Sequence, residues 1–323
     1  MFPKKSLVNK FFSLILLLSL VLSFCGCKEE STVTPISADT DMITFTDDLE
    51  RQVSVPAGTK DAVVLVGSLA DIWNLSGGNI TATAKDAWED FSLDLPDAVN
   101  LGTVKNPDLE LLLSTNPSFV IASSNTASNI NLLPILESAG ITVAFFNIAS
   151  FNDYLNMLNI CTDITGRKDL YEKNGIMTGE KINIAKEKFL SEEIEENEKT
   201  YLLLRVSSGL IKAKRSNSYV LGGMLKDLGY TNIADTNTSL LEDLSVETII
   251  AENPYRIFII QMGDDLDSAR KNVDTMFSEN PAWKSLTAFR EGRVHFMDKR
   301  LFSLKPNARW GESYEILADI LRK

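Results

Sequence analysis

Residues 108–122 read DLELLLSTNPSFVIA, and residues 245–259, SVETIIAENPYRIFI, align with them without a gap. In each copy a residue able to cap a helix, Asp108 or Ser245, precedes a short helical pattern, an Asn-Pro pair and an apolar run. Proline cannot continue a helix and drives the preceding residue towards extended backbone, so each copy predicts a helix followed by a strand. One such unit in each half of the chain predicts two lobes of related architecture.

The same alternation of strands and helices surrounds both copies. Short apolar runs predict buried parallel strands at Val63–Val66, Phe119–Ala122, Val143–Phe146, Tyr201–Val206, Ile257–Ile260 and Val294–Phe296. Helical spacing predicts helices at Leu69–Leu75, Leu109–Ser114, Ile130–Ser138, Val220–Leu228, Val246–Ala251, Ala269–Phe277 and Ala308–Leu321. Alternating polar and apolar residues at Ile43–Thr46 and Gln52–Val55 predict a β-hairpin before the first lobe.

Between the two lobes the strand patterns stop. Phe151–Ile164 and Asp169–Glu196 carry helical periodicity and contain no strand pattern. We therefore expect an α/β protein with two lobes joined through a long helix. The expected boundaries are 42–165 for the N-terminal lobe, 166–198 for the connecting helix and 199–323 for the C-terminal lobe.

The first residues of the chain indicate where in the cell the protein is located. Three lysines precede the apolar run Phe11–Phe24, which is too short to cross a bilayer comfortably and is typical of a secretory signal rather than a retained membrane helix. Gly26 places a small residue before Cys27, where a signal peptidase needs little bulk. The arrangement resembles a bacterial lipoprotein signal, which implies lipid on Cys27. We therefore expect a signal peptide at 1–26 and a polar, flexible tether at 27–41.

Composition excludes several classes of function. Removal of the signal lowers the 32 Lys and Arg residues to 29 against 44 Asp and Glu, a net charge of −15, which argues against a nucleic-acid partner. It also discards Cys25 and leaves Cys161 as the free thiol, so no disulfide framework is expected. A single histidine, His295, excludes a multi-histidine metal site, and no phosphate-binding loop or G-x-S-x-G is present. We expect no enzyme, no resident metal and no cofactor.

Five stretches carry a family resemblance. They are TFTDDLERQVSVP (44–56), VVLVGSLADIWNLSGG (63–78), LGTVKNPDLELLLSTNPSFVIAS (101–123), MLKDLGYTNIAD (224–235) and NPAWKSLTAFREGRVHFMD (280–298). Together they resemble the iron-siderophore and cobalamin substrate-binding lipoproteins of ABC importers, over essentially all of Thr44–Lys323. The resemblance implies two Rossmann-like lobes with mostly parallel sheets, one rigid connecting helix and a ligand cleft between the lobes. Glu50 stands where the family generally has Gly, so we expect a different backbone in that turn.

In such a cleft the ligand meets the loops that follow the strands. We therefore predict ligand contacts from Ser68, Trp88, Asn125, Arg205, Lys214, Gln261, Phe302 and Arg309. For Trp88 the alternative role is packing in the core. For Lys214, together with Lys212, the alternative is a place in an ordinary solvated hairpin. Arg205 interrupts an apolar strand, so its guanidinium needs a partner.

Arg309 lies in the first turn of the predicted last helix, where the helix dipole disfavours a cation. This placement predicts either an anionic ligand or a salt bridge to Glu312. Both alternatives stay open from the sequence alone.

Glu110 and Glu247 occupy the same position in the two copies of the repeat. Each can stabilise the start of its helix through the dipole. That role does not explain the match between the lobes, and the family resemblance implies a second one. In it, one glutamate per lobe reaches arginines of the membrane permease.

The family resemblance and the lipoprotein signal together imply a monomeric receptor outside the cytoplasmic membrane, anchored by lipid on Cys27. It would deliver an iron chelate or a corrinoid to an ABC permease dimer. Haem is the alternative ligand, with His295 or Tyr219 as the candidate axial group. A non-transport α/β lipoprotein is the other alternative, and an apolar surface between the lobes with no pocket would favour it.

Overall fold

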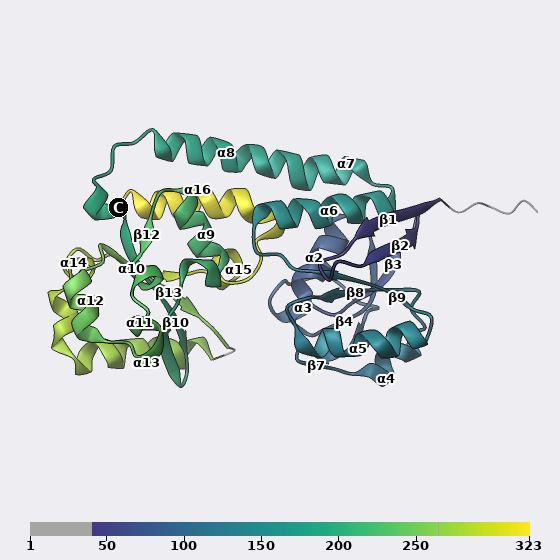
Figure 1. Ribbon diagram of the computed structural model, residues 1–323, viewed down its shortest axis with the longest axis horizontal. Helices are drawn as coiled ribbons and strands as arrows, with labels where there is room; N and C mark the ends of the chain where they lie inside the picture. The colour runs from purple at the N-terminus through teal and green to yellow at the C-terminus, as the bar shows by residue number, and fades with distance from the viewer. Residues whose placement is uncertain (1–40, 264) are drawn as a thin grey trace, which may run out of the picture. The chain divides into compact units, whose positions relative to one another are not determined.

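The computed structural model describes residues 41–263 and 265–323 (Figure 1). The predicted signal peptide, the tether up to residue 40 and the lipidation site Cys27 lie outside the described residues. Within the described ranges, no helix combines the length and the apolar character needed to cross a bilayer.

The N-terminal lobe is built on a five-stranded sheet of order β5-β4-β3-β8-β9, in which all neighbours are parallel. Its strands are β3 (Asp61–Val64), β4 (Asn79–Thr83), β5 (Val99–Asn100), β8 (Phe119–Ser123) and β9 (Thr142–Phe146). Its helices are α2 (Gly67–Leu75), α3 (Asp86–Glu89), α4 (Leu109–Ser114), α5 (Ala127–Ser138) and α6 (Phe151–Thr165). A small antiparallel pair, β6 (Gly102–Thr103) and β7 (Asn106–Pro107), precedes α4. Every strand and helix predicted for this lobe is present, but β3 ends at Val64 and not at Val66, which precedes α2.

The C-terminal lobe has a second sheet of order β11-β10-β13-β14, with β12 beside β10. Its strands are β10 (Thr200–Ser207), β11 (Leu210–Ala213), β12 (Thr231–Asn232), β13 (Arg256–Gln261) and β14 (Val294–Met297). Its helices are α9 (Val220–Asp227), α10 (Ile233–Thr236), α11 (Ser239–Glu242), α12 (Val246–Glu252), α13 (Leu266–Glu279), α14 (Thr287–Arg290), α15 (Lys299–Phe302) and α16 (Trp310–Leu321). Only β11 runs antiparallel to its neighbour. The α/β fold class predicted from the sequence is confirmed.

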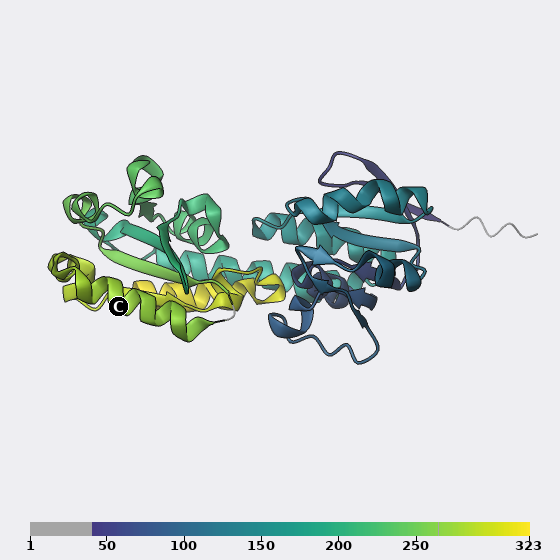
Figure 2. The ribbon, with the colours of Figure 1, turned by 90° about the horizontal axis from the view of Figure 1, so that it is seen from below.

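Each sheet separates two layers of helices (Figure 2). Successive side chains of a strand point to opposite faces, so Leu203 and Leu204 of β10 enter different hydrophobic clusters. The cluster of Leu203 continues through α8, α16 and α6 into the N-terminal lobe, where it includes Trp73. One continuous core therefore joins the two lobes on this side of both sheets.

The two copies of the repeat have the same local structure. Asp108 and Ser245 cap α4 and α12 through side-chain oxygens that accept from the backbone N–H three residues later. Asn116 and Asn253 both adopt left-handed backbone, with φ of 48° and 43°. The predicted caps are confirmed, and each unit leads into a strand that lies between two parallel neighbours.

The connecting segment is helical from Lys168 to Leu190. It comprises α7 (Lys168–Tyr171), one π-helical turn (Glu172–Ile176) and α8 (Met177–Leu190), and α8 packs along α16 (Figure 1). The prediction of helix as far as Glu196 is wrong at this end. Acidic residues follow Ser191 in close succession, and the helix dipole disfavours carboxylates at a helix C-terminus.

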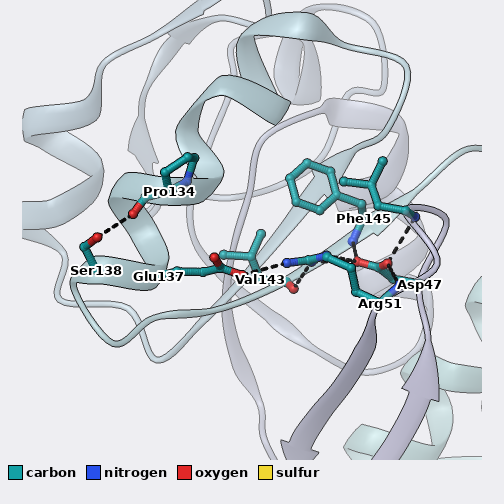
Figure 3. Close-up of polar contacts among 8 residues, drawn as sticks. Asp47, Arg51, Pro134, Glu137, Ser138, Val143 and Phe145 are labelled. Atoms are coloured by element: carbon teal, nitrogen blue, oxygen red, sulfur yellow. Dashed lines mark hydrogen bonds and ion pairs between the residues drawn. The ribbon is translucent and has the colours of Figure 1, made fainter.

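The predicted N-terminal hairpin is confirmed as β1 (Met42–Thr46) and β2 (Gln52–Pro56). The buried Asp47 carboxylate accepts hydrogen bonds from the backbone N–H of Arg51 and of Phe145, at 3.0 and 3.1 Å. The Arg51 guanidinium binds the same carboxylate at 2.6 Å and donates to the carbonyl oxygen of Val143 at 2.7 Å (Figure 3). The hairpin turn is therefore fixed to the edge strand β9.

Glu50 adopts a φ of 60° in this turn, which is the left-handed backbone that suits glycine. The expectation that this turn has a different backbone is therefore wrong. Glu50 keeps the left-handed backbone, and its Cβ causes steric strain that glycine would not have. We predict that Glu50→Gly raises the free energy of unfolding by about 0.5–1 kcal/mol, since left-handed strain outweighs the entropy of glycine in the unfolded chain. Urea denaturation measures the change. Glu50→Ala keeps the Cβ and serves as the control; an equal gain from both variants would contradict the backbone explanation.

Candidate functional site

Three cations share one face of the C-terminal sheet. Arg205 of β10 lies directly opposite Lys212 of β11, and Lys214 continues the ladder by donating its backbone N–H to Leu203. Directly opposed residues of an antiparallel pair project from the same face, which is also the face that Leu203 and Ile260 bury. We call Arg205, Lys212 and Lys214 the cation cluster.

The cation cluster has no carboxylate partner among the described residues. Every ion pair of the described chain involves other side chains. Like charges directly opposite each other in a sheet repel, so Arg205 and Lys212 favour an anion placed between them. Tyr219 lies near Arg205, and burial raises its pKa although the guanidinium opposes that shift.

Residues that follow β14 join the two lobes. Lys299 Nζ binds Asp90 Oδ1 at 2.5 Å, and Arg300 binds Asp71 Oδ2 at 2.7 Å. The side-chain amide of Asn307 donates to the same Asp71 oxygen at 2.8 Å. Burial raises the pKa of Asp71, while Arg300 and the amide oppose that change. These charged contacts hold α15 and the loop after it against α2 and α3.

Two hollows receive residues from both lobes. The first has a volume of about 510 Å³ and is lined by Glu89, Asp90, Gly263, Lys299 and Leu304, among others. The second, of about 330 Å³, lies where α6, α8, α9 and α16 meet, and its lining includes Phe151, Lys186, Trp310 and Tyr314. Both receive residues from both lobes, so the junction is hollowed rather than flat and apolar.

The N-terminal residues predicted to contact a ligand lie at the carboxyl ends of the strands. The backbone oxygen of Ser68 accepts from the Asn307 amide at 2.9 Å, which places Ser68 at the lobe junction. Trp88 is half-buried on α3 and packs partly against the core. Asn125 is exposed after β8, and its amide donates to the Asn147 side chain at 2.6 Å. The structure brings Ser68 close to the C-terminal lobe and leaves Asn125 at the surface.

The C-terminal residues predicted to contact a ligand do not lie together. Gln261 pairs with Val206, so it projects from the sheet face opposite to Arg205. Phe302 is 1% exposed and packs in the core, because the short helix α15 turns its apolar side inwards. The structure therefore places the Phe302 side chain in the core and not at the surface. Arg309 forms two hydrogen bonds with Glu312, at 2.6 and 2.7 Å, so the salt-bridge alternative holds for it.

The candidate haem ligands, His295 and Tyr219, are both half-buried. His295 is the second residue of β14 and stacks on Phe258, with 5.5 Å between the ring centres. Burial, with Arg256 and Arg293 nearby, lowers the pKa of His295 to about 4. Among the described residues no group of three or more His, Cys, Asp or Glu side chains could hold a metal ion.

Asp86 lies where α3 meets the first turn of α2. Its carboxylate accepts from the Gly67 backbone N–H at 2.9 Å, and a Cβ on Gly67 would come within 2.6 Å of the Ala87 nitrogen. Burial raises the pKa of Asp86 to about 6, and Asp90 and Glu89 add to the shift while the Gly67 hydrogen bond opposes it. The fold therefore favours the protonated acid.

A pKa raised by folding means that stability falls as the pH rises from about 4 through about 6. We predict that Asp86→Asn stabilises the protein by about 1–2 kcal/mol at pH 7, because the variant has no buried charge at this position. The gain should disappear at pH 4, where the wild-type acid is mostly protonated. Thermal denaturation at both pH values measures this difference; a gain that is equal at both would contradict the titration of Asp86.

The sequence prediction missed the residues of the lobe junction. Asp71 is the one charged residue in the run LADIW, between buried neighbours of α2. A carboxylate on an otherwise apolar helix face requires a buried partner, and this signal was available in the sequence. Lys299 and Arg300 have no comparable signal, because basic residues are common in exposed loops.

Glu110 and Glu247 are both exposed at the second position of their helices. The Glu247 carboxylate accepts from the Ser245 hydroxyl at 3.3 Å. Neither glutamate forms an ion pair with a described residue. Both carboxylates are therefore accessible to a partner.

Comparison with known proteins identifies the family. Residues 63–301 match the family model described as periplasmic binding protein. The iron-uptake system-binding protein of Bacillus subtilis (strain 168) is 26% identical over 309 residues, which cover 93% of this chain and 92% of that protein. The putative ABC transporter substrate-binding lipoprotein YhfQ of the same organism is 24% identical over 311 residues, covering 91% and 92%.

A solved structure shows the same fold. Staphylococcus aureus SirA complexed with staphyloferrin B matches this chain with a TM-score of 0.66 at 17% identity, covering 86% of this chain and 96% of that one. The family model spans strands and helices of both lobes, from β3 to α15. Since the matched residues make up well over half of the chain, this protein belongs to the periplasmic binding protein family.

Proposed function

We propose that this protein is an extracytoplasmic receptor that captures an iron chelate or a corrinoid between its lobes and delivers it to an ABC permease dimer. Its family consists of binding proteins, so its role is to bind a substrate and not to transform it. The names of two relatives, one an iron-uptake protein and one an ABC transporter lipoprotein, support this role.

The cation cluster carries the proposal. Arg205 and Lys212 lie side by side without a carboxylate partner among the described residues, in a chain with a net charge of −12. An anionic chelate would relieve their mutual repulsion and accept charged hydrogen bonds, which are stronger than neutral ones. This observation favours an anionic iron chelate over a neutral corrinoid. Haem is less favoured, because burial raises the pKa of Tyr219 and His295 lies away from the carboxyl end of β14.

Native mass spectrometry of the protein purified from its own host tests this proposal. Absorption spectra taken on the same sample distinguish ferric chelates, haem and corrinoids. We expect a bound mass that contains iron and an anionic organic chelator. A protein that carries no small molecule and binds none of these ligands on titration would support the non-transport alternative.

We also propose that lipid on Cys27 anchors the receptor to the membrane. The lipoprotein signal supports this, as does the naming of the relative YhfQ as a lipoprotein. We predict that Cys27→Ala releases the protein from membranes or leaves an uncleaved precursor. Cys25→Ser is the control and should change little. Membrane fractionation measures the outcome, and an acylated N-terminal peptide that begins at Cys25 would contradict the assignment.

A further inference from the structure

A glycine of α9 leaves room in the hollow where α6, α8, α9 and α16 meet (Figure 1). Gly223 lines this hollow, and a Cβ built on it meets no atom within 4 Å. A Cβ on its neighbour Gly222 would instead lie 1.9 Å from the Ser216 carbonyl oxygen. Glycine inside a helix lowers helix stability relative to alanine. Packing within the chain therefore explains Gly222 but not Gly223, and we call the hollow beside Gly223 the α9 cavity.

The α9 cavity is separate from the cations proposed to bind the chelate. Among the described residues that line it there is no member of the cation cluster and no residue of the hollow at Asp90 and Lys299. Its volume of about 330 Å³ lies at the lower end of the range of small-molecule sites, roughly 300–1,000 Å³. A compact ligand can therefore occupy the cavity while a chelate is bound elsewhere.

The polar side chains of the α9 cavity offer both donors and acceptors of hydrogen bonds. Lys186 Nζ and Tyr314 Oη both donate to Asp227 Oδ2, at 3.0 and 2.8 Å. The other carboxylate oxygen of Asp227, Oδ1, accepts no hydrogen bond from a described residue. The side chains of Asn152 and Asn183 are exposed and form no hydrogen bond within the described chain. A side-chain amide both donates and accepts, so several groups of the cavity are available to a ligand.

The charge of the α9 cavity favours a neutral ligand. Lys186 and Asp227 form an ion pair, and the other described residues of the lining carry no charge. A charged ligand would lose water and would have to compete with this pair for a partner. A hydroxyl group can donate to Asp227 Oδ1 and accept from an amide without breaking the pair. Phe151 and Met224 add apolar surface to the lining, which suits the C–H groups of a hydroxylated ring.

We infer that the α9 cavity is a second small-molecule site, which binds a neutral polyhydroxylated ligand of the size of one sugar ring. The hydroxyl groups of the ligand bind Asp227 Oδ1 and the amides of Asn152 and Asn183. Its apolar face packs against Phe151, at the start of α6 in the N-terminal lobe, and against Met224 of α9 in the C-terminal lobe. The ligand therefore contacts both lobes, and it binds whether or not the receptor holds a chelate.

Calorimetry and saturation-transfer NMR on the purified protein test the chemical class of the ligand. The neutral probes are glucose, mannose and myo-inositol, and the charged probes are glucuronate and glucosamine. We expect the neutral probes to bind at millimolar concentration and the charged probes to bind more weakly by roughly tenfold or more. Failure of all three neutral probes to bind, or tighter binding of a charged probe, would overturn the inference.

Gly223→Leu tests the location of the site. The leucine side chain enters the α9 cavity without a clash at its Cβ, so binding of the neutral probes should be lost while the protein stays folded. Lys226→Leu adds the same side chain at an exposed position of α9 outside the cavity, and it should leave probe binding unchanged. Wild-type binding by Gly223→Leu would place the probes elsewhere and overturn the inference.

A second variant tests the site without filling it. Asn152→Ala combined with Asn183→Ala removes two exposed amides that have no described partner, so the fold should persist. We expect a Kd for the neutral probes that is higher by roughly tenfold, from the loss of two hydrogen bonds. An unchanged Kd would overturn the assigned contacts. Chelate affinity should be unchanged in this variant and in Gly223→Leu, so failure of the second site and failure of the proposed function are distinguishable.

Discussion

Replacing Glu110 and Glu247 together with alanine is expected to abolish uptake while the affinity for the ligand stays unchanged. Both carboxylates are exposed and form no ion pair with a described residue, so the folded receptor has little use for them internally. If the two glutamates are separated anchors on the permease, as we propose, the loss of both removes the orientation that charge complementarity supplies. A transport assay with the labelled chelate in the native host measures the effect.

Stability and ligand binding are the controls for this prediction. Each glutamate contributes about 0.3–1 kcal/mol to its helix through the dipole, so the double variant should remain folded. Glu180→Ala combined with Glu187→Ala removes two exposed glutamates of α8 and should leave uptake normal. If the variant at Glu110 and Glu247 imported the chelate at the wild-type rate, the two residues would be helix caps only.

The repeat predicted the fold well because it combines signals that act locally. A cap, an Asn-Pro stop and an apolar run determine helix, turn and strand from neighbouring residues, and the structure confirms both copies. Strand β4 lacks such signals. Its sequence NITAT contains one asparagine and two threonines, and its position in the sheet depends on pairing with β3 and β5. Pairing between distant segments is not visible in one sequence.

The candidate site was predicted less completely than the fold. Arg205 was recognised because a charge interrupts an apolar strand, and it does lack a carboxylate partner among the described residues. Lys212 is not among the residues predicted to contact a ligand, because only the register of β11 on β10 places it opposite Arg205. Phe302 and Gln261 are predicted only from their position after strands. Which way a side chain points there depends on the turn that follows, and the sequence does not specify it.

The lobe junction explains why several cations of the chain are poor candidates for ligand binding. Lys299 and Arg300 already bind Asp90 and Asp71 of the other lobe, and Arg309 already binds Glu312. A ligand would have to displace these carboxylates before it could bind the cations. Arg205, Lys212 and Lys214 have no carboxylate to displace among the described residues. An anionic ligand therefore gains more binding free energy from these three cations than from the paired ones.

Arg205→Ala is therefore expected to weaken binding of the chelate identified by native mass spectrometry by roughly tenfold to a hundredfold. A hydrogen bond to a charged group contributes about 1.5–3 kcal/mol, which corresponds to that range of Kd. Replacing all three members of the cation cluster with glutamine should weaken binding by more than roughly a hundredfold, although neighbouring sites need not add. Calorimetry on folded variants measures each Kd.

Two variants test whether the loss of a positive charge outside the cation cluster also weakens binding. Lys188→Gln removes an exposed lysine of α8 that forms no ion pair with a described residue, and it should leave the Kd unchanged. Arg309→Ala should have a smaller effect than Arg205→Ala, since Glu312 already occupies that guanidinium. Added salt should weaken binding to the wild type more than to the triple variant, because exposed charges are screened.

The outcome for the triple variant decides what the cation cluster does. The sheet would be more stable without three neighbouring positive charges, so their retention for stability alone has no physical basis. If the triple variant bound the chelate with wild-type affinity and with wild-type dependence on salt, the cluster would be an ordinary solvated hairpin. The ligand would then have to be held by the residues around the hollow at Asp90 and Lys299, where recognition would depend on shape and on exchange of the interlobe salt bridge.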